Sequence, residues 1–207
     1  MNDLLQLAVA AHGGTRRWSD FFKLEAQLSV GGTLLAGRVE REPALTVRLV
    51  ADLYKQRVVW APAGEQLLNT DAAWGPQQTA WFSGDTAWSD LVQPFLYTYP
   101  GFVCEEIAPW EEDGETWRRL KITLPEQLAQ HGREQVSYFG PDGLLRRHDY
   151  QLDEQGALQC ASYASDYLNV DGIGVPTRRR IYARDAAGRR VAQAPLFAID
   201  IDHIAFV

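Results

Sequence analysis

The chain has few of the residues that most often mark a metal or redox site. It contains two cysteines and four histidines among 207 residues. Cys104 and Cys160 form no CxxC pair, and neither has a histidine at a metal-ligand spacing, so the sequence predicts neither a metal site nor a redox pair. We interpret both thiols as small, buried apolar side chains. No cofactor is expected.

Long apolar runs are also missing, since no stretch approaches the roughly 18 residues of a membrane span. The N-terminal run LLQLAVAA has Asp3 before it instead of the basic segment of a signal peptide. We predict an amphipathic helix here, capped by Asn2 or Asp3 and ended by Gly13 or Gly14. The simplest location for the protein is then the cytoplasm.

The familiar enzyme motifs are absent as well. There is no GxSxG, GxGxxG, GxxxxGK[ST] or HExxH, and no cysteine beside a histidine that would act as its base. No catalytic residue is therefore assigned. A site assembled from distant residues stays open.

Positive charge is scarce, with 20 Lys and Arg against 27 Asp and Glu, a formal net charge of -7 and a sequence pI near 5.1. Such a chain repels phosphate backbones, so nucleic acid is not an expected partner. The one dense basic run is Arg178 to Arg180. Strand alternation would put Arg179 on one face and its two neighbours on the other.

Alternating apolar and polar residues dominate the rest of the chain and predict antiparallel strands joined by short turns. Asp113-Gly114 and Asp171-Gly172 are typical hairpin turns. A chain of 207 residues, 46% hydrophobic and 23% charged, fits a single globular domain, residues 1–207. The predicted strands are FFKLEAQLSVGG, TLLAGRVE, ALTVRLVADL, QRVVWAP, EQLLN, FVCEEIAPWEE, ETWRRLKITL, REQVSYF, LLRRHDYQL, ALQCASYASDYLNV, GVPTRRRIYARD and LFAIDIDHIAFV.

Residues 71–101 break this pattern with aromatic residues, prolines and glycines. Ser89 or Asp90 can cap a short helix through Leu96, although Pro94 fits poorly beyond a first helical turn. A second short helix is predicted from Pro125 to His131. With so few helices, a sheet of about ten strands must hide its apolar face either by closing on itself or by curling around a helix, and curling around the aromatic segment is the simpler solution. The predicted fold class is mainly β (α+β), a single large curved antiparallel sheet that forms a half-barrel around short helices.

Two segments, VSYFGPDGLLRRHDYQL and DYLNVDGIGVPTRRRIY, resemble uncharacterised bacterial proteins with the LolA/LolB-like fold of outer-membrane lipoprotein carriers. They cover roughly residues 133–183, and the order of elements extends the resemblance loosely over the whole chain. The resemblance implies a half-barrel lined by apolar and aromatic side chains that holds acyl chains under a helical lid. The sequence departs from the carriers in lacking their signal peptide and lipid-attachment cysteine. No individual functional residue is transferred.

Aromatic side chains provide large, rigid walls for an apolar ligand, or they simply fill the concave side of the sheet. Arg179 is added because a buried guanidinium needs an acidic ligand group or a buried Asp or Glu partner; if the register shifts by one residue, Arg178 and Arg180 face inward instead. The candidate ligand-binding residues are Trp60, Trp81, Phe82, Trp88, Phe95, Tyr97, Tyr99, Phe102 and Arg179.

Other polar residues fit structural roles better. His148 and Asp149 are adjacent on a strand and must point to opposite faces, so they cannot form a dyad. We predict a solvated polar face of the sheet for Asp166, Asp200 and Asp202. His203 is predicted on the apolar face as a hydrogen-bonded core histidine. His12, at the end of the first helix, is expected to interact with terminal carbonyls.

Three classes of function remain open on this sequence. The preferred hypothesis is a soluble binding protein for a lipid or other hydrophobic small molecule, such as an acyl chain, held in the concave cavity. The alternatives are an enzyme that acts on an apolar substrate in the same cavity and a protein-interaction module with a self-filled core. Two titratable groups with shifted pKa values inside the cavity would favour the enzyme. A contiguous apolar surface would favour the module, and the sequence leaves the oligomeric state open.

Overall fold

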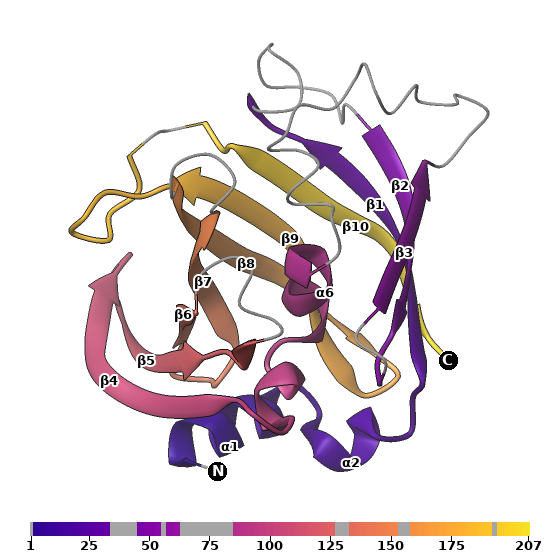
Figure 1. Ribbon diagram of the computed structural model, residues 1–207, viewed down its shortest axis with the longest axis horizontal. Helices are drawn as coiled ribbons and strands as arrows, with labels where there is room; N and C mark the ends of the chain where they lie inside the picture. Colours follow the sequence, from indigo (N-terminus) through magenta and orange to yellow (C-terminus); the bar gives the residue numbers. More distant parts are fainter. Residues whose placement is uncertain are drawn as a thin grey trace.

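The computed structural model contains one curved, open antiparallel sheet with few helices (Figure 1). It describes residues 2–33, 45–54, 57–62, 85–126, 133–152, 158–191 and 194–207, with only the backbone described for 45, 57–62 and 85–88. The predicted strand EQLLN, all of the predicted strand TLLAGRVE except Thr33, and most of the predicted helix after Pro125 lie outside these residues.

The described strands form a sheet of ten, in the order β3-β2-β1-β10-β9-β8-β7-β6-β5-β4. Each strand pairs antiparallel with its neighbours in this order. The pairing of β1 with β10 brings the first and the last strand of the chain together. The fold class expected from the sequence is thus confirmed. The strands are β1 (Lys23–Gly31), β2 (Leu45–Asp52), β3 (Arg57–Pro62), β4 (Val103–Glu112), β5 (Glu115–Thr123), β6 (Glu134–Phe139), β7 (Leu145–Leu152), β8 (Leu158–Val170), β9 (Ile173–Ala183) and β10 (Phe197–Phe206).

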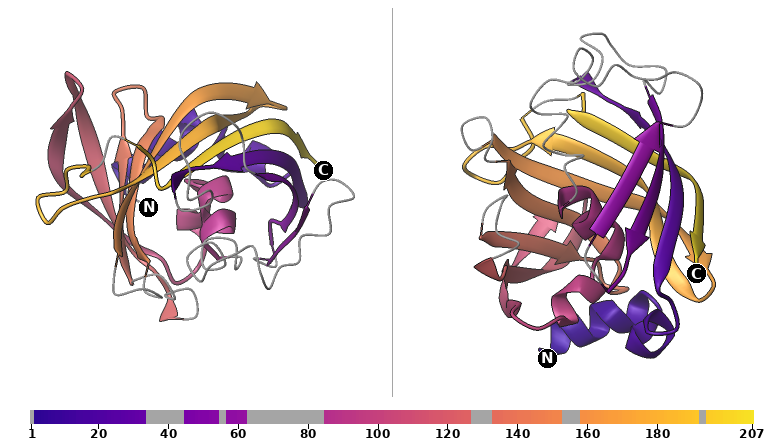
Figure 2. Two further views of the ribbon diagram at one scale, coloured as in Figure 1. Left: turned by 90° about the horizontal axis from the view of Figure 1, so that it is seen from above. Right: turned by 45° about the vertical axis from the view of Figure 1, so that its right-hand side comes forward.

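The helices lie at one end of the sheet and on its concave side. Helices α1 (Asp3–Ala11) and α2 (Gly14–Trp18) cross one end, while α6 (Asp85–Val92) and the 3-10 helix η1 (Phe95–Thr98) lie under the arch of strands (Figures 1 and 2). The Asn2 side chain accepts a hydrogen bond from the amide of Leu5, which confirms one of the predicted N-caps.

Two predicted turns have the conformation that their sequence demands. At Asp113-Gly114 the φ angles are 52° and 79°, and at Asp171-Gly172 they are 52° and 89°. Positive φ at both central residues is the geometry of a two-residue hairpin turn whose twist matches the strands. These turns join β4 to β5 and β8 to β9.

The prediction for His203 is wrong, because a β-bulge reverses the alternation of β10. The register with β1 runs from Gln27 opposite His203 to Leu28 opposite Ile201, so Asp202 is an extra residue. His203 consequently points outward and is exposed. It lines a shallow depression of about 340 Å³ together with Glu25 and Arg48.

The expected solvated face is confirmed, since Asp166 and Asp202 are exposed and Asp200 is partly exposed. Asp200 pairs with Arg178 and Arg180 on the outer side of β9. For the cysteines the prediction holds only in part. Both are free, but Cys160 on β8 is buried whereas Cys104 on β4 is only partly buried.

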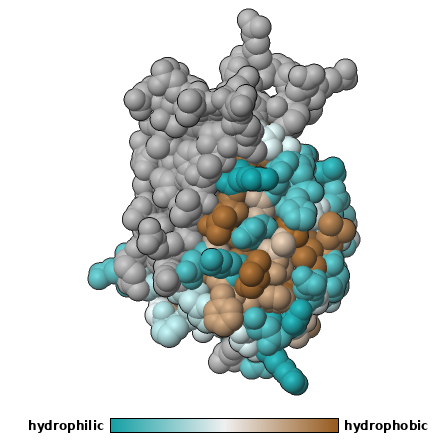
Figure 3. All heavy atoms as spheres, turned by 90° about the vertical axis from the view of Figure 1, so that its right-hand side faces the viewer, coloured by the Kyte–Doolittle hydropathy of each residue, from teal (hydrophilic) through white to brown (hydrophobic). Residues whose placement is uncertain are grey.

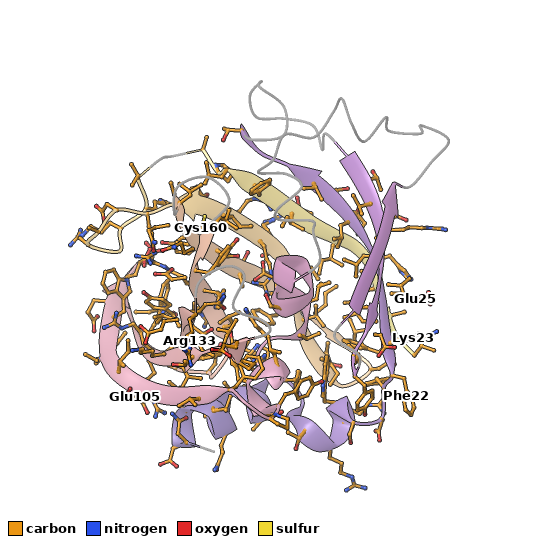
Figure 4. The ribbon with its side chains drawn as sticks, in the orientation of Figure 1. Phe22, Lys23, Glu25, Glu105, Arg133 and Cys160 are labelled. Atoms are coloured by element: carbon orange, nitrogen blue, oxygen red, sulfur yellow. The ribbon has the colours of Figure 1, made fainter. Side chains whose placement is uncertain are left out.

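The outer surface near β1 and β2 carries scattered apolar side chains among polar ones (Figure 3). Phe22, Tyr54 and Val207 are more than half exposed, and Val50 is 39% exposed. Lys23 and Glu25 point away from the sheet on this side, and Glu105 points away from β4 on the opposite side (Figure 4). Mixed surfaces of this kind are ordinary for soluble domains.

Candidate functional site

The segment of α6 and η1 enters the concave side of the sheet and is the central element of the candidate site (Figure 2). The helix begins at Asp85 and ends at Val92, earlier than the predicted end at Leu96. Pro94 has no amide proton to continue the helix, and the chain passes through a cis Gln93-Pro94 bond into η1. Asp90, Gln93 and Tyr97 of this segment are buried.

The aromatic residues of η1 and its flanks pack against the protein's own core. Phe95 is 1% exposed and stacks on Trp18, with ring centroids 4.3 Å apart. The hydroxyl of Tyr99 donates to the carbonyl of Leu53 at 3.0 Å and accepts from the Trp18 indole at 3.2 Å. Phe102 is partly buried against the same core. These contacts fix η1 between α2 and the sheet.

The concave face has an apolar half formed by β1, β2 and β10. Every second residue of β1 and β2 points inward, and all of these inward residues are apolar. Phe197 and Ile199 on β10 extend the same wall. The inward residues of β1 and β2 are Leu24, Ala26, Leu28, Val30, Val47, Leu49 and Ala51.

A polar row crosses the other half of the concave face. Ser137 on β6, His148 on β7 and Ser162 on β8 are direct cross-strand neighbours, and all three are at most 1% exposed. We call these three residues the polar row. Buried polar side chains generally have hydrogen-bond partners, so we expect such partners for each residue of the polar row.

His148 is held by hydrogen bonds at both ring nitrogens. Its Nε2 donates to Gln135 Oε1 at 3.0 Å, which leaves Nδ1 to accept from Ser137 Oγ at 3.0 Å. The hydroxyl of Tyr97 lies 2.7 Å from Ser137 Oγ and 3.4 Å from the same Nδ1. Segment η1 is thereby joined to the polar row.

Arg179 faces inward, whereas the sequence leaves open whether Arg179 or its neighbours Arg178 and Arg180 do so. The side chain is buried and pairs with the buried Asp90 of α6, with Nη1 3.5 Å from Oδ1, and also donates to the Asp90 backbone carbonyl. On the sheet, Arg179 lies opposite Ala164, two residues from Ser162 on the same face of β8. Its buried acidic partner is thus a residue of the chain itself.

Burial shifts the pKa values of these groups away from their charged forms. It lowers the pKa of His148 to about 3, and the nearby Arg179 charge acts in the same direction. Burial likewise raises the pKa of Asp90, although Arg179 opposes this, and it raises the pKa of the Tyr97 hydroxyl. His148 is therefore neutral at physiological pH.

Several polar atoms here have no hydrogen-bond partner within the described part of the chain. They are Oδ2 of Asp90, both amide atoms of Gln93 and Oγ of Ser162. All three side chains are at most 5% exposed. Asp90 pairs with Arg179, Gln93 follows Asp90 by three residues, and Ser162 lies two residues from Ala164, the strand neighbour of Arg179. Because an unpartnered buried polar atom costs about 1–3 kcal/mol, these atoms are candidates for contact with a ligand.

Of the candidate ligand residues, the structure brings Phe95, Tyr97, Tyr99, Phe102 and Arg179 together on the α6–η1 segment, its C-terminal flank and the sheet beneath. Trp60 lies on β3 and Trp88 on α6, with side chains outside the described atoms. Trp81 and Phe82 lie outside the described residues.

The sequence prediction missed the polar row and the role of Asp90. It considered Asp90 only as a helix cap, and it examined His148 only as a partner of Asp149. The available signal was the alternation in QVSYF, RRHDY and CASYA, which places a polar residue at an inward position of each strand.

A second buried charge cluster lies on the outer face. Arg147 is completely buried and donates to Asp149 at 2.6 and 2.8 Å and to Glu112 at 2.8 Å. The rings of Trp110, Tyr138 and Tyr163 surround its guanidinium at 4.8–5.6 Å. His148 and Asp149 thus face opposite sides as predicted, yet both are buried.

His12 meets its prediction. Its Nδ1 donates to the Ala8 carbonyl at 2.7 Å, near the end of α1. Burial lowers the pKa of this imidazole to about 4. It packs edge-on against Tyr167 of β8, which places it outside the candidate site.

Neither a metal site nor a spanning helix emerges from the described residues. They contain no group of three or more histidine, cysteine, aspartate or glutamate side chains placed to hold a metal ion. Among their helices, none is both long enough and apolar enough to cross a membrane.

Comparison with known proteins identifies the fold. No protein-family model matches the chain, and no curated protein matches it. A LolA superfamily protein from Nitrosomonas europaea superposes with a TM-score of 0.51 at 10% identity, over 98% of this chain and 92% of that chain. A domain from Vibrio parahaemolyticus, provisionally described as an outer membrane lipoprotein-sorting protein, gives 0.55 at 9% identity, over 99% and 93%. The protein has a LolA-like fold.

Proposed function

We propose that the protein binds a hydrophobic small molecule with an acyl-like chain on the concave side of its sheet. The observation that carries this proposal is the uninterrupted apolar half of the concave face, formed by alternate residues of β1 and β2. Apolar contact stabilises a bound chain by about 25 cal/mol for each Å² removed from water. The likeness of fold to a LolA superfamily protein supports the same conclusion.

Two features of the described residues favour an enzyme. Burial shifts the pKa values of His148 and Asp90 on the concave side, and hydrogen bonds join Ser137, His148 and Gln135. A serine, a histidine and a group that orients the histidine are the parts of an activated nucleophile. A general base works best with a pKa near the working pH, however, and burial holds the pKa of His148 at about 3. Ser137 is also completely buried. We therefore favour binding over catalysis.

Matched substitutions on β1 test the proposed binding face. Ala26 points inward and is 5% exposed, whereas its neighbour Gln27 points outward. Ala26→Phe adds a ring to the apolar half and Gln27→Phe adds the same ring to the outer face. We expect Ala26→Phe to weaken binding of a fluorescent fatty-acyl probe at least about tenfold, and Gln27→Phe to leave it unchanged.

Unfolding midpoints of both variants show whether each retains a folded structure. A photoreactive fatty-acyl probe then locates the site, with labelled peptides expected from β1, β2 or the α6–η1 segment. Equal affinity in both variants, or labelling confined to the outer face, contradicts the proposal.

A further inference from the structure

The concave side divides into two chemically different halves, and this division constrains the ligand. The inward residues of β1 and β2 are entirely apolar. The polar row lies on β6 to β8, where Tyr97 of η1 contacts Ser137. Arg179 lies on β9, where it pairs with Asp90 of α6. A pure hydrocarbon would match only the first half. A molecule with one polar end would match both.

The unpartnered atoms define the chemistry of that polar end. Asp90 Oδ2 and Gln93 Oε1 accept hydrogen bonds, Gln93 Nε2 donates them, and Ser162 Oγ does both. All are buried, and each lacks a partner within the described residues. A group that satisfies them must carry donors as well as acceptors, as hydroxyl and amide groups do.

The charges of the site decide between an ionic and a neutral group. Arg179 is the buried cation and Asp90 the buried anion, and the two are paired with each other. A head group of either charge would be attracted to one member of this pair and repelled by the other, so the pair offers it little net attraction. Such a head group would also pay for burial of a net charge, which is severe without a partner.

We infer that the ligand is an uncharged amphiphile whose hydroxyl- or amide-bearing head lies among Asp90, Gln93 and Ser162, while its chain lies against β1 and β2. This inference rests on the proposed function, because it assigns a head group to the ligand proposed there. Ordered water satisfying the same atoms is the competing explanation.

A series of ligands that share a lauroyl or dodecyl chain tests this inference. The heads are glycerol in monolauroylglycerol, a primary amide in lauramide, a carboxylate in laurate and a quaternary ammonium in dodecyltrimethylammonium. Affinities are measured by calorimetric titration below the micelle concentration of each ligand. We expect monolauroylglycerol to bind about tenfold more tightly than laurate, since each satisfied buried group is worth up to about a factor of ten.

Substitutions that remove the unpartnered polar atoms test whether this head-group preference arises at the proposed site. Ser162→Ala and Gln93→Met should each reduce the ratio of monolauroylglycerol to laurate affinity several-fold. Ser165→Ala, at an exposed position of the same strand, is the matched control and should keep the wild-type ratio. Circular dichroism and thermal unfolding confirm that each variant is folded.

The outcomes separate the two proposals. Equal affinity for all four heads, or tighter binding of laurate, overturns the neutral head and leaves the hydrophobic binding site standing. A preference for the glycerol head that survives in both variants also overturns this assignment. If no ligand of the series binds to the wild-type protein, the proposed function itself fails.

Discussion

At the residue scale, the two buried arginines show how differently a sheet can hold a guanidinium. Arg179 pairs with Asp90, whose Oδ2 has no hydrogen-bond partner within the described residues. Arg147 has Asp149 and Glu112 and three surrounding rings. Buried charges are tolerated when they are paired and hydrogen-bonded. The Arg147 cluster is therefore structural, whereas the Arg179 cluster retains unused hydrogen-bonding capacity.

Removal of Arg147 tests this distinction. Arg147→Met removes the buried counter-charge of Asp149 and Glu112 and leaves Asp149 with the partly exposed Arg184 at 3.4 Å, so we expect the free energy of unfolding to fall by about 3 kcal/mol. Arg178→Met is the control, because Arg178 is half exposed in its pairs with Asp166 and Asp200, and such surface pairs contribute about 1 kcal/mol or less. Urea unfolding measures both; similar small losses would show that Arg147 is not central to stability.

The buried histidines predict a pH dependence of stability. Folding lowers the pKa of His148 to about 3 and of His12 to about 4, from about 6.5. Below pH 6.5 the unfolded state binds protons that the folded state does not. Stability is thus complete above pH 6.5 and falls with pH, by about 1.4 kcal/mol per pH unit for each histidine, until the folded pKa is reached.

His148→Gln isolates one of these contributions. Between pH 7 and pH 5 the wild-type free energy of unfolding should fall by about 2 kcal/mol more than that of the variant. Urea unfolding at the two pH values gives the difference directly. Parallel pH profiles for the two proteins would mean that the folded state accommodates a charged His148.

At the element scale, local patterns predicted most strands and turns because they are set by neighbours in sequence. Asp-Gly pairs gave the hairpin turns. Alternation on β9 placed Arg179 and its two neighbours on opposite faces, but it left open which face is inward. Where one strand of a pair carries an extra residue, alternation alone fails to predict which face of the sheet a side chain occupies. The bulge at Asp202 turned His203 outward, and only the pairing of β10 with β1 reveals it.

The docking of the first two helices depends on a close backbone approach. Gly13, between α1 and α2, has a φ angle of 117°, and an added Cβ would collide with the carbonyl of Gly172 in the β8–β9 turn. Gly14 also has a positive φ angle, 82°, but an added Cβ would meet nothing within 4 Å. Substitution of Gly14 therefore tests backbone strain alone, and substitution of Gly13 tests strain together with the contact between the helices and the β8–β9 turn.

We expect Gly14→Ala to lower the free energy of unfolding by about 1 kcal/mol, the cost of a left-handed conformation for alanine. Gly13→Ala carries the same strain and in addition forces the helices away from the hairpin, so about 3 kcal/mol or more is expected. Chemical unfolding of the two variants provides the comparison. Equal losses would show that this approach of helices and hairpin contributes little.

At the scale of the whole molecule, the order of elements predicted a curved antiparallel sheet, and the resemblance predicted a LolA-like fold; both are confirmed. The division of the concave side could not be predicted. It depends on which strands become neighbours and on the path of α6 and η1 across them. Likewise, the charged sequence RRHDY gives no sign that Arg147 and Asp149 are buried. Their burial depends on the β4–β5 hairpin, which is distant in sequence and carries Trp110.

The most direct test is a crystal structure with a monoacylglycerol whose acyl chain ends in bromine, located by anomalous scattering. The account predicts a bromine peak against the apolar half, near Leu28 and Leu49, and glycerol density beside Asp90 and Ser162. A peak on the outer face, such as the depression of about 470 Å³ beside Trp110 and Arg189, would contradict it. So would a chain lying in the reverse direction.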